Sequence, residues 1–293
     1  MGFIINKYDP CVANSIIDGK QCTICWYVDD AKISHVDSKV VDKVICQLED
    51  VFGKMTVTRG NQHTFVGMDF ELNGDGSVAI SMTSYIKEAI DVFGEELSGN
   101  VKTPAKGTLF DEDTDGFTEP LSEEKAELFH HIVAKLLYVS KRARIDIDPT
   151  IAYLCTRVAH PTVGDWARLR RVLQYLQGTI QMKRIIGANG LELLQSWADA
   201  SFAVHRDMKG HTGACMSMGR GVVHHRTAKQ KLNTRSSTES ELVAASDYIC
   251  WTVWAKRFLS EQGYDLKRNI FYQDNAHGGL YVHGAWSGSP SDG

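Results

Sequence analysis

The stretch QCTICWYVDDAKIS, residues 21–34, places two adjacent carboxylates between two apolar runs of β-prone residues. This pattern predicts a β-hairpin with Asp29 and Asp30 at its turn. Successive side chains of an extended chain point to opposite faces, so one Asp could face a metal ion while the other supports it. Two carboxylates this close repel each other unless a cation or a proton lies between them. Taken alone, the stretch favours a polar turn over a divalent metal site, because Asp is a common turn residue; the rest of the chain reverses that preference.

The whole chain has the composition of an ordinary globular protein. Its 293 residues are 43% hydrophobic and 23% charged, which leaves room for two domains or one large one. No apolar run is long enough to cross a membrane, and the first residues lack the pattern of a signal peptide. Seven scattered cysteines do not suggest a disulfide framework, so reduced thiols inside the cell are expected. The net charge of −4 gives no global attraction to nucleic acid.

Hydrophobic periodicity divides the chain into helices and strands. It predicts helices at 38–52, 84–93, 123–142, 149–158, 165–177 and 237–259. Besides the hairpin, it predicts strands at 64–72, 77–81, 191–204, 213–218, 221–225 and 270–273. Residues 99–121 are rich in Gly, Thr, Pro and acids and are expected to form a linker. The result is an α+β chain whose last part runs strand, strand, strand, helix, strand.

Six stretches carry a family resemblance, in the same order along the chain. They are the hairpin stretch; 52–55 with 63–68; 129–153, which contains Arg144-Ile145-Asp146-Ile147; 170–179; Ser236-Ser237-Thr238-Glu239-Ser240-Glu241-Leu242; and Phe271-Tyr272-Gln273-Asp274-Asn275. Together they resemble the Pol polyprotein of copia-type retrotransposons over roughly residues 1–275.

The resemblance implies a division of the chain. Residues 1–98 would be a partial reverse transcriptase, with the C-terminal part of the palm, its β-hairpin and a thumb-like region. The linker at 99–121 would lead to a helical connection at 122–190. Residues 191–275 would form a truncated ribonuclease H-like domain, a mixed sheet with a helix, and 276–293 a disordered tail unrelated to the family.

The resemblance also implies two phosphoryl-transfer sites that use Mg²⁺ or Mn²⁺, because such chemistry needs clustered carboxylates. Asp29 and Asp30 would bind metal in the polymerase half. Asp199, Glu241 and Asp274, from a strand, a helix and a later strand, would do so in the ribonuclease H half. Each Glu of the signature also closes a capping box, Ser236 with Glu239 and Thr238 with Glu241, so either could simply cap the helix.

Local basic runs are the candidate contacts to nucleic acid. The first is Lys141, Arg142 and Arg144; the second is Lys229, Lys231 and Arg235. A further basic run is Arg168-Leu169-Arg170-Arg171, and a solvated helix face is an equally good interpretation of that run and of the first. The resemblance implies template RNA, primer, RNA–DNA hybrid and the rest of the Pol polyprotein as partners, no membrane, and a cytoplasmic particle and the nucleus as locations.

The chain departs from the family pattern at both ends. A reverse transcriptase needs a further metal-binding Asp on a strand upstream of the hairpin, but Asp9 and Asp18 lie in turn-like contexts. The Gly- and Ser-rich residues 276–293 show no helical period. Both active sites are therefore expected to be incomplete, with no polymerase activity. An inert transposon remnant and a domesticated nucleic-acid-binding module remain the alternatives.

Overall fold

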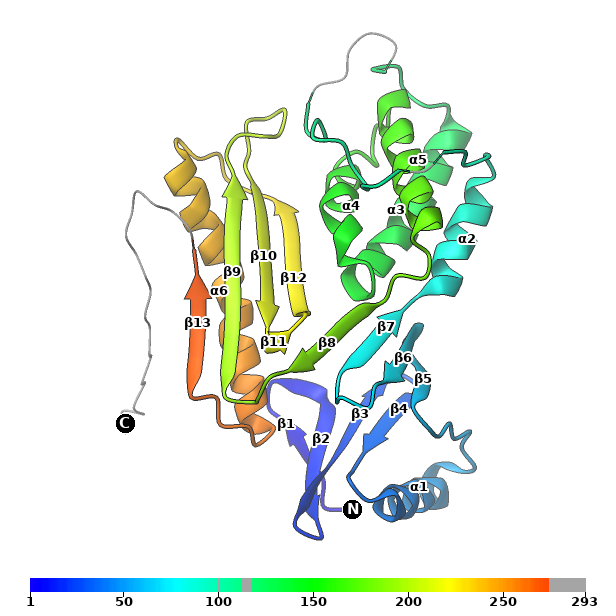
Figure 1. The fold of residues 1–293 in the computed structure, drawn as a ribbon, viewed down its shortest axis with the longest axis vertical. Helices are drawn as coiled ribbons and strands as arrows, with labels where there is room; N and C mark the ends of the chain where they lie inside the picture. Colours follow the sequence, from blue (N-terminus) through cyan, green and yellow to red (C-terminus); the bar gives the residue numbers. More distant parts are fainter. Residues whose placement is uncertain (100, 112–116, 274–293) are drawn as a thin grey trace.

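The computed structural model describes residues 1–99, 101–111 and 117–273. Its helices and three β-sheets confirm the expected α+β class (Figure 1). None of the helices in this described part is long and apolar enough to span a membrane.

The first sheet carries the hairpin. It is antiparallel in the order β1 (Ile4–Asn6), β2 (Asp9–Ile17), β3 (Lys20–Tyr27) and β4 (Asp30–Ser34), and α1 (Ser38–Phe52) packs against it. The hairpin of β3 and β4 was expected, whereas β1 and β2 were not predicted. Its buried hydrophobic side chains are few: Cys22, Val40 and Val44 form a core between the sheet and α1, and Val12 and Ala13 of β2 are also buried. The tetrad at residues 27–30 therefore lies on a thinly packed unit.

The second sheet joins segments about a hundred residues apart in sequence. Its order is β11 (Gly219–Arg220), β8 (Arg184–Ala188), β7 (Val78–Ser81), β6 (Met68–Leu72) and β5 (Gln62–Phe65). The single strand expected at 64–72 is wrong, because the chain reverses between β5 and β6. Val66 and Gly67 have φ of +51° and +69°, and a Cβ at Gly67 would lie 2.9 Å from the Tyr85 ring. Glycine is thus required at that turn.

A helical layer packs on this sheet. It consists of α2 (Thr83–Phe93), α3 (Glu123–Arg142), the 3₁₀ turn η1 (Ile145–Ile147), α4 (Asp148–Cys155) and α5 (Val163–Gly178). The hydrophobic core runs without a break from α2 through α3, α4 and α5, and includes Ile86, Phe129 and Leu173. The expected linker contributes to this packing, since Leu109 is buried and the Phe110 ring contacts Tyr153.

The third sheet has the order β12 (Val222–Lys229), β10 (His211–Ser217), β9 (Leu193–Ser201) and β13 (Arg268–Tyr272), with β13 parallel to β9. The helix α6 (Ser237–Glu261) covers one face of it (Figure 1). Leu194, Ala244 and Tyr248 are buried between that helix and the sheet. The expected order of three strands, a helix and a strand is confirmed.

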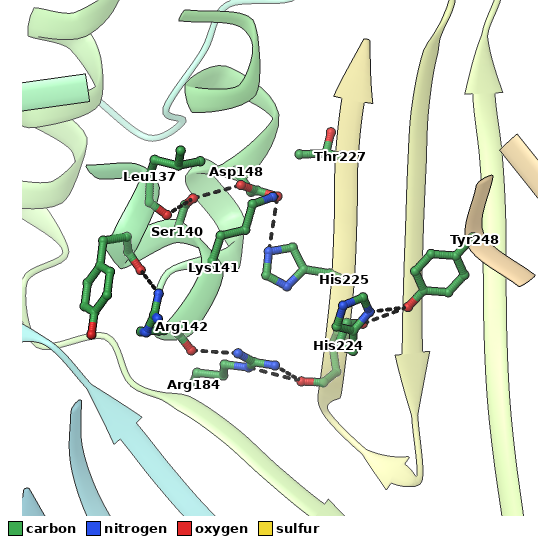
Figure 2. A network of polar contacts seen from close by, with 12 residues as sticks. Leu137, Ser140, Lys141, Arg142, Asp148, Arg184, His224, His225, Thr227 and Tyr248 are labelled. Atoms are coloured by element: carbon green, nitrogen blue, oxygen red, sulfur yellow. Dashed lines mark hydrogen bonds and ion pairs between the residues drawn. The ribbon is translucent and has the colours of Figure 1, made fainter. Parts of the chain in front are cut away.

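Polar contacts tie the third sheet to the helical layer, on the face opposite α6. His225 of β12 approaches the buried Asp148 at 3.1 Å, and Ser140 and Lys141 of α3 donate to the same carboxylate at 2.8 and 2.7 Å (Figure 2). Arg184 donates to the main-chain oxygens of Arg142 and Val222, which joins the end of α3 to β12. The sheet and the connection are therefore held in one arrangement.

Candidate metal centre

Two of the predicted acids meet at the end of β9. Along that strand Leu194, Ser196 and Ala198 are buried towards α6, whereas Asp199 lies on the exposed, opposite side. Glu241 projects from the first turns of α6 and is 8% exposed. The backbone N–H of Ala200 donates to Asp199 Oδ1 at 2.8 Å and to Glu241 Oε1 at 3.1 Å. One N–H thus brings together carboxylates from two elements.

The two carboxylates are electrostatically strained. Burial raises the pKa of Glu241, and the negative charge and hydrogen bond of Asp199 act in the same direction. Hydrogen bonds from the Ala200 N–H and the Gln273 amide lower it, but they do not cancel the effect. The largest contributions come from burial, from these two hydrogen bonds and from Asp199. A hard divalent cation would relieve the repulsion, and carboxylate oxygens are the ligands it prefers, so the pair fits such an ion in its chemistry.

The neighbouring Glu239 has a different task. The Ser236 hydroxyl accepts from the Glu239 N–H at 3.2 Å, and Glu239 Oε2 accepts from the Arg235 N–H at 2.6 Å. These bonds cap the start of α6. The geometry therefore assigns capping to Glu239 and leaves Glu241 to face Asp199.

The third predicted acid, Asp274, lies outside the described residues. The strand before it runs parallel to β9, with Tyr272 opposite Trp197, and the Gln273 amide reaches Glu241 Oε2 at 3.5 Å. Within the described ranges no group of three His, Cys, Asp or Glu side chains could hold a metal ion. Gln273 was not predicted as part of the site, since nothing in the sequence separates it from an ordinary residue after a strand.

Asp29 and Asp30 are placed at the turn of the hairpin, as expected, and both are exposed. The turn holds Val28 at a φ of +54°, a left-handed conformation that is rare for a β-branched residue. Asp9, expected in a turn, begins β2 and accepts from the Cys11 N–H at 2.9 Å. Asp18 lies in the turn between β2 and β3. The structure thus adds no further described acid to the tetrad.

The basic residues separate into structural and exposed ones. Arg144 is 1% exposed and donates to Asp146 and Thr179, so its predicted role as a nucleic-acid contact is wrong. Lys141 pairs with Asp148, and Arg142 lies 3.5 Å from the centre of the Tyr138 ring.

In the second run, Lys229 pairs with Asp207 at 2.8 Å. Lys231 and Arg235 are exposed beside the start of α6. The predicted phosphate contacts therefore rest mainly on these last two residues.

A cavity of about 210 Å³ lies away from the carboxylates, between the 99–121 segment, α4 and the loop after β9. Phe110, Tyr153, Arg157, His205 and Lys229 are among the residues that line it. Arg157 already pairs with Asp165 and Lys229 with Asp207, and burial lowers the pKa of His205 to about 4. Arg157 and Lys229 on the cavity wall thus already have acidic partners. We therefore regard the Asp199–Glu241 pair as the stronger candidate site.

Comparison with known proteins agrees with the motif-based expectation. The chain is 25% identical over 274 residues to a retrovirus-related Pol polyprotein from a transposon of Nicotiana tabacum, which covers 91% of this chain and 20% of that polyprotein. It is 26% identical over 262 residues to the Pol polyprotein from transposon RE1 of Arabidopsis thaliana, covering 87% of this chain and 17% of the relative. The chain thus spans about a fifth of the length of these polyproteins.

Other similarities are shorter or weaker. An uncharacterized mitochondrial protein of Arabidopsis thaliana is 26% identical over 245 residues, which is 83% of this chain and 98% of that protein. A foamy viral protease-reverse transcriptase in complex with double-stranded DNA has a TM-score of 0.48 at 13% identity, covering 88% of this chain and 47% of that one, too low a similarity to support an argument. No protein-family model matches the sequence. Over most of its length the chain is therefore similar to part of the Pol polyproteins of plant transposons.

Proposed function

We propose that this chain contains a ribonuclease H-type unit that hydrolyses the RNA strand of an RNA–DNA hybrid with the help of a divalent cation. The observation that carries the proposal is the meeting of Asp199 and Glu241, which lie on different elements and share one backbone N–H. Burial and the neighbouring Asp199 raise the pKa of Glu241, and a perturbed carboxylate beside a second one supports a cation-binding role.

In the proposed reaction, Asp199 and Glu241 would hold Mg²⁺ or Mn²⁺, with Asp274 as the expected further ligand. Such an ion, when bound, supplies an activated water and stabilises the oxygen that leaves the phosphate. The protein supplies orientation, because the Ala200 N–H fixes one oxygen of each carboxylate.

The nucleic-acid partner of this unit would be a hybrid duplex that lies across the end of the sheet. Lys231 and Arg235 precede the first turn of α6 and are exposed, so they could neutralise phosphates beside the carboxylates. Their contribution predicts binding that weakens as the salt concentration rises.

We propose that the tetrad at residues 27–30 derives from a reverse transcriptase but gives this chain no polymerase activity of its own. Asp29 and Asp30 are exposed on a hairpin, and the described residues bring no third acid to them. Template-directed DNA synthesis by this chain on its own is therefore not expected.

The experiment is a cleavage assay on a labelled RNA–DNA hybrid, with and without Mg²⁺ or Mn²⁺. Cleavage by the wild type should disappear in Asp199→Asn and Glu241→Gln. Glu239→Gln is the matched control, because it changes the same residue type two positions away, where the side chain caps the helix.

The outcomes separate the proposal from its alternatives. Metal-dependent cleavage that the two site variants abolish supports the enzyme. Salt-sensitive binding of the hybrid without cleavage would favour a nucleic-acid-binding module, and neither binding nor cleavage would favour an inert remnant.

A further inference from the structure

A buried glutamine connects the sheet to the start of the helix that carries Glu241. Gln230 follows β12 and is only 1% exposed. Its Nε2 donates to the main-chain oxygen of Ser240 at 2.9 Å and to the Thr212 hydroxyl at 3.2 Å. Ser240 immediately precedes Glu241, so this amide ties the first turns of α6 to β10 and β12.

The orientation of the amide follows from its partners. A main-chain carbonyl can only accept, so the NH₂ group of Gln230 must face Ser240. Its Oε1 is then left buried without a hydrogen-bond partner among the described residues. A buried acceptor without a partner is destabilising, and the two hydrogen bonds that Nε2 donates must offset that cost. The glutamine therefore has a reason other than core packing.

The surrounding chain leaves room for this amide. A Cβ on Gly210 would lie 2.5 Å from Gln230 Oε1 and 2.9 Å from the Ser201 carbonyl oxygen. The Gln230 N–H also donates to the Gly210 carbonyl oxygen at 2.9 Å. Only glycine at 210 thus lets the Gln230 amide lie between the sheet and the helix.

Ser240 is held a second time. Its hydroxyl forms a 2.6 Å hydrogen bond with that of Thr234 in the loop before the helix. Main chain and side chain of the residue before Glu241 are both restrained, and Glu241 itself then meets the Ala200 N–H on β9. In metal sites generally, the groups that hydrogen-bond to a metal-binding side chain set the position of that side chain and the affinity for the metal.

We propose that Gln230 is a positioning residue that sets where Glu241 lies relative to Asp199. The inference rests on the proposed function, which makes Glu241 a metal ligand. Gln230 acts only through the first turns of α6, and it does not touch the reacting atoms. Loss of its amide frees Ser240 and lets Glu241 move away from the Ala200 N–H.

The test uses the full chain with Gln230→Leu, which keeps the size of the side chain and removes both donors. Hydrogen exchange of the Ala200 amide, followed by NMR without any metal, reports on the N–H that Glu241 shares with Asp199. We expect exchange at Ala200 to become about tenfold faster or more. In parallel, the affinity for Mn²⁺ should fall by about tenfold.

Gln262→Leu is the matched control. Gln262 is also buried, at 5% exposed, and accepts a hydrogen bond from Gln21 at the far end of the same helix. The 21 positions between it and Glu241 correspond to about 30 Å of helix. This variant removes a buried amide of the same kind and should leave both the Ala200 exchange and the Mn²⁺ affinity unchanged.

Unchanged Ala200 exchange in folded Gln230→Leu would overturn the proposal, and so would an equal effect in Gln262→Leu. If Gln230→Leu does not fold, Thr212→Val replaces it as the test, because it removes only the hydroxyl that accepts from Gln230 on the sheet. Thr212→Val should speed Ala200 exchange by a smaller factor. Unchanged Ala200 exchange in this variant would also overturn the proposal. If wild type and Asp199→Asn bind Mn²⁺ alike, the proposed function fails instead, while the Ala200 exchange still decides the role of Gln230.

Discussion

The tetrad turn and the end of β9 each bring two acids together, and they do so in opposite ways. Asp29 and Asp30 are neighbours in sequence, exposed on a hairpin that rests on a small core. Asp199 and Glu241 are 42 positions apart, and helix packing brings them to one N–H. Water screens the first pair, whereas in the second pair Glu241 is buried, and burial raises its pKa beside the Asp199 carboxylate.

The difference shows that proximity of charges in sequence is a poor measure of a site. An exposed pair costs little and therefore requires no function. When tertiary packing brings two carboxylates together at a cost in free energy and hydrogen bonds hold them there, ligand binding is the better explanation of the arrangement. Asp148 shows the third possibility: a buried carboxylate that Ser140, Lys141 and His225 compensate fully, and that needs no ligand.

The largest effect is expected from the pair at the end of β9. Asp199→Asn should slow metal-dependent cleavage of an RNA–DNA hybrid on the order of 1000-fold, because it removes one of the two proposed ligands within the described residues. A hybrid-cleavage time course measures this. If Asp199→Asn retained cleavage, the contrast between the two acid pairs would fail. Asp199 would then have no more catalytic importance than Asp29 and Asp30.

Asp148→Asn should lower the free energy of unfolding by about 3 kcal/mol at pH 7, because Lys141 and His225 lose a buried partner. Burial opposes ionisation of Asp148, but hydrogen bonds from His225 and Lys141 outweigh it and hold its pKa below the ordinary 3.8.

A carboxylate with a lowered pKa contributes stability above its unfolded pKa and loses that contribution as the pH falls. The difference between wild type and Asp148→Asn should therefore be full at pH 7 and shrink as the pH is lowered from about 4. Urea unfolding at several pH values measures it. A difference that grows at low pH would show that Asp148 is not a compensated structural acid.

Val28→Gly should raise the free energy of unfolding by about 0.5–1 kcal/mol, since glycine accepts the positive φ at no steric cost. Val36→Gly is the matched control: Val36 is also exposed, but it is not among the residues with positive φ, so glycine there should destabilise. Urea unfolding compares the two. Destabilisation by Val28→Gly would mean that the valine makes a contact worth more than its strain.

The smallest effect should come from the tetrad acids themselves. Asp29→Asn and Asp30→Asn should change the free energy of unfolding by less than about 0.5 kcal/mol, because both side chains are exposed. Neither should alter hybrid cleavage. Template-directed incorporation of nucleotides by the wild type that Asp29→Asn abolishes would reverse the ranking of the two acid pairs.

Sequence patterns predicted the features that depend on residues close together in the sequence. The helices at 38–52 and 123–142 have the expected bounds, because each carries its apolar face within one segment. The acids on β9 and α6 could be found because short motifs surround them. In contrast, β8 pairs with β7 about a hundred residues earlier, and its few residues carry no signal of that partner.

The contacts that hold the site were beyond prediction for the same reason. Arg144 looked like part of a basic run, but only the fold shows that Thr179, 35 positions later, accepts from its guanidinium. Gln230 and Gln273 are polar residues in polar surroundings of the sequence, and their burial depends on packing against α6. Long-range partners decide these roles, and a single sequence does not record them.

One uninterrupted helix, α6, contacts both the third sheet and the first sheet. Beyond the turn that holds Glu241, α6 reaches the first sheet, where Trp254 donates to the Tyr8 carbonyl and Asn6 donates to the Phe258 carbonyl. Each residue added to or removed from the middle of α6 would rotate one anchored end against the other by about 100°. Only insertions or deletions close to a whole number of helical turns would therefore preserve both attachments. The number of residues in α6 is thus more tightly constrained than the identity of its exposed side chains.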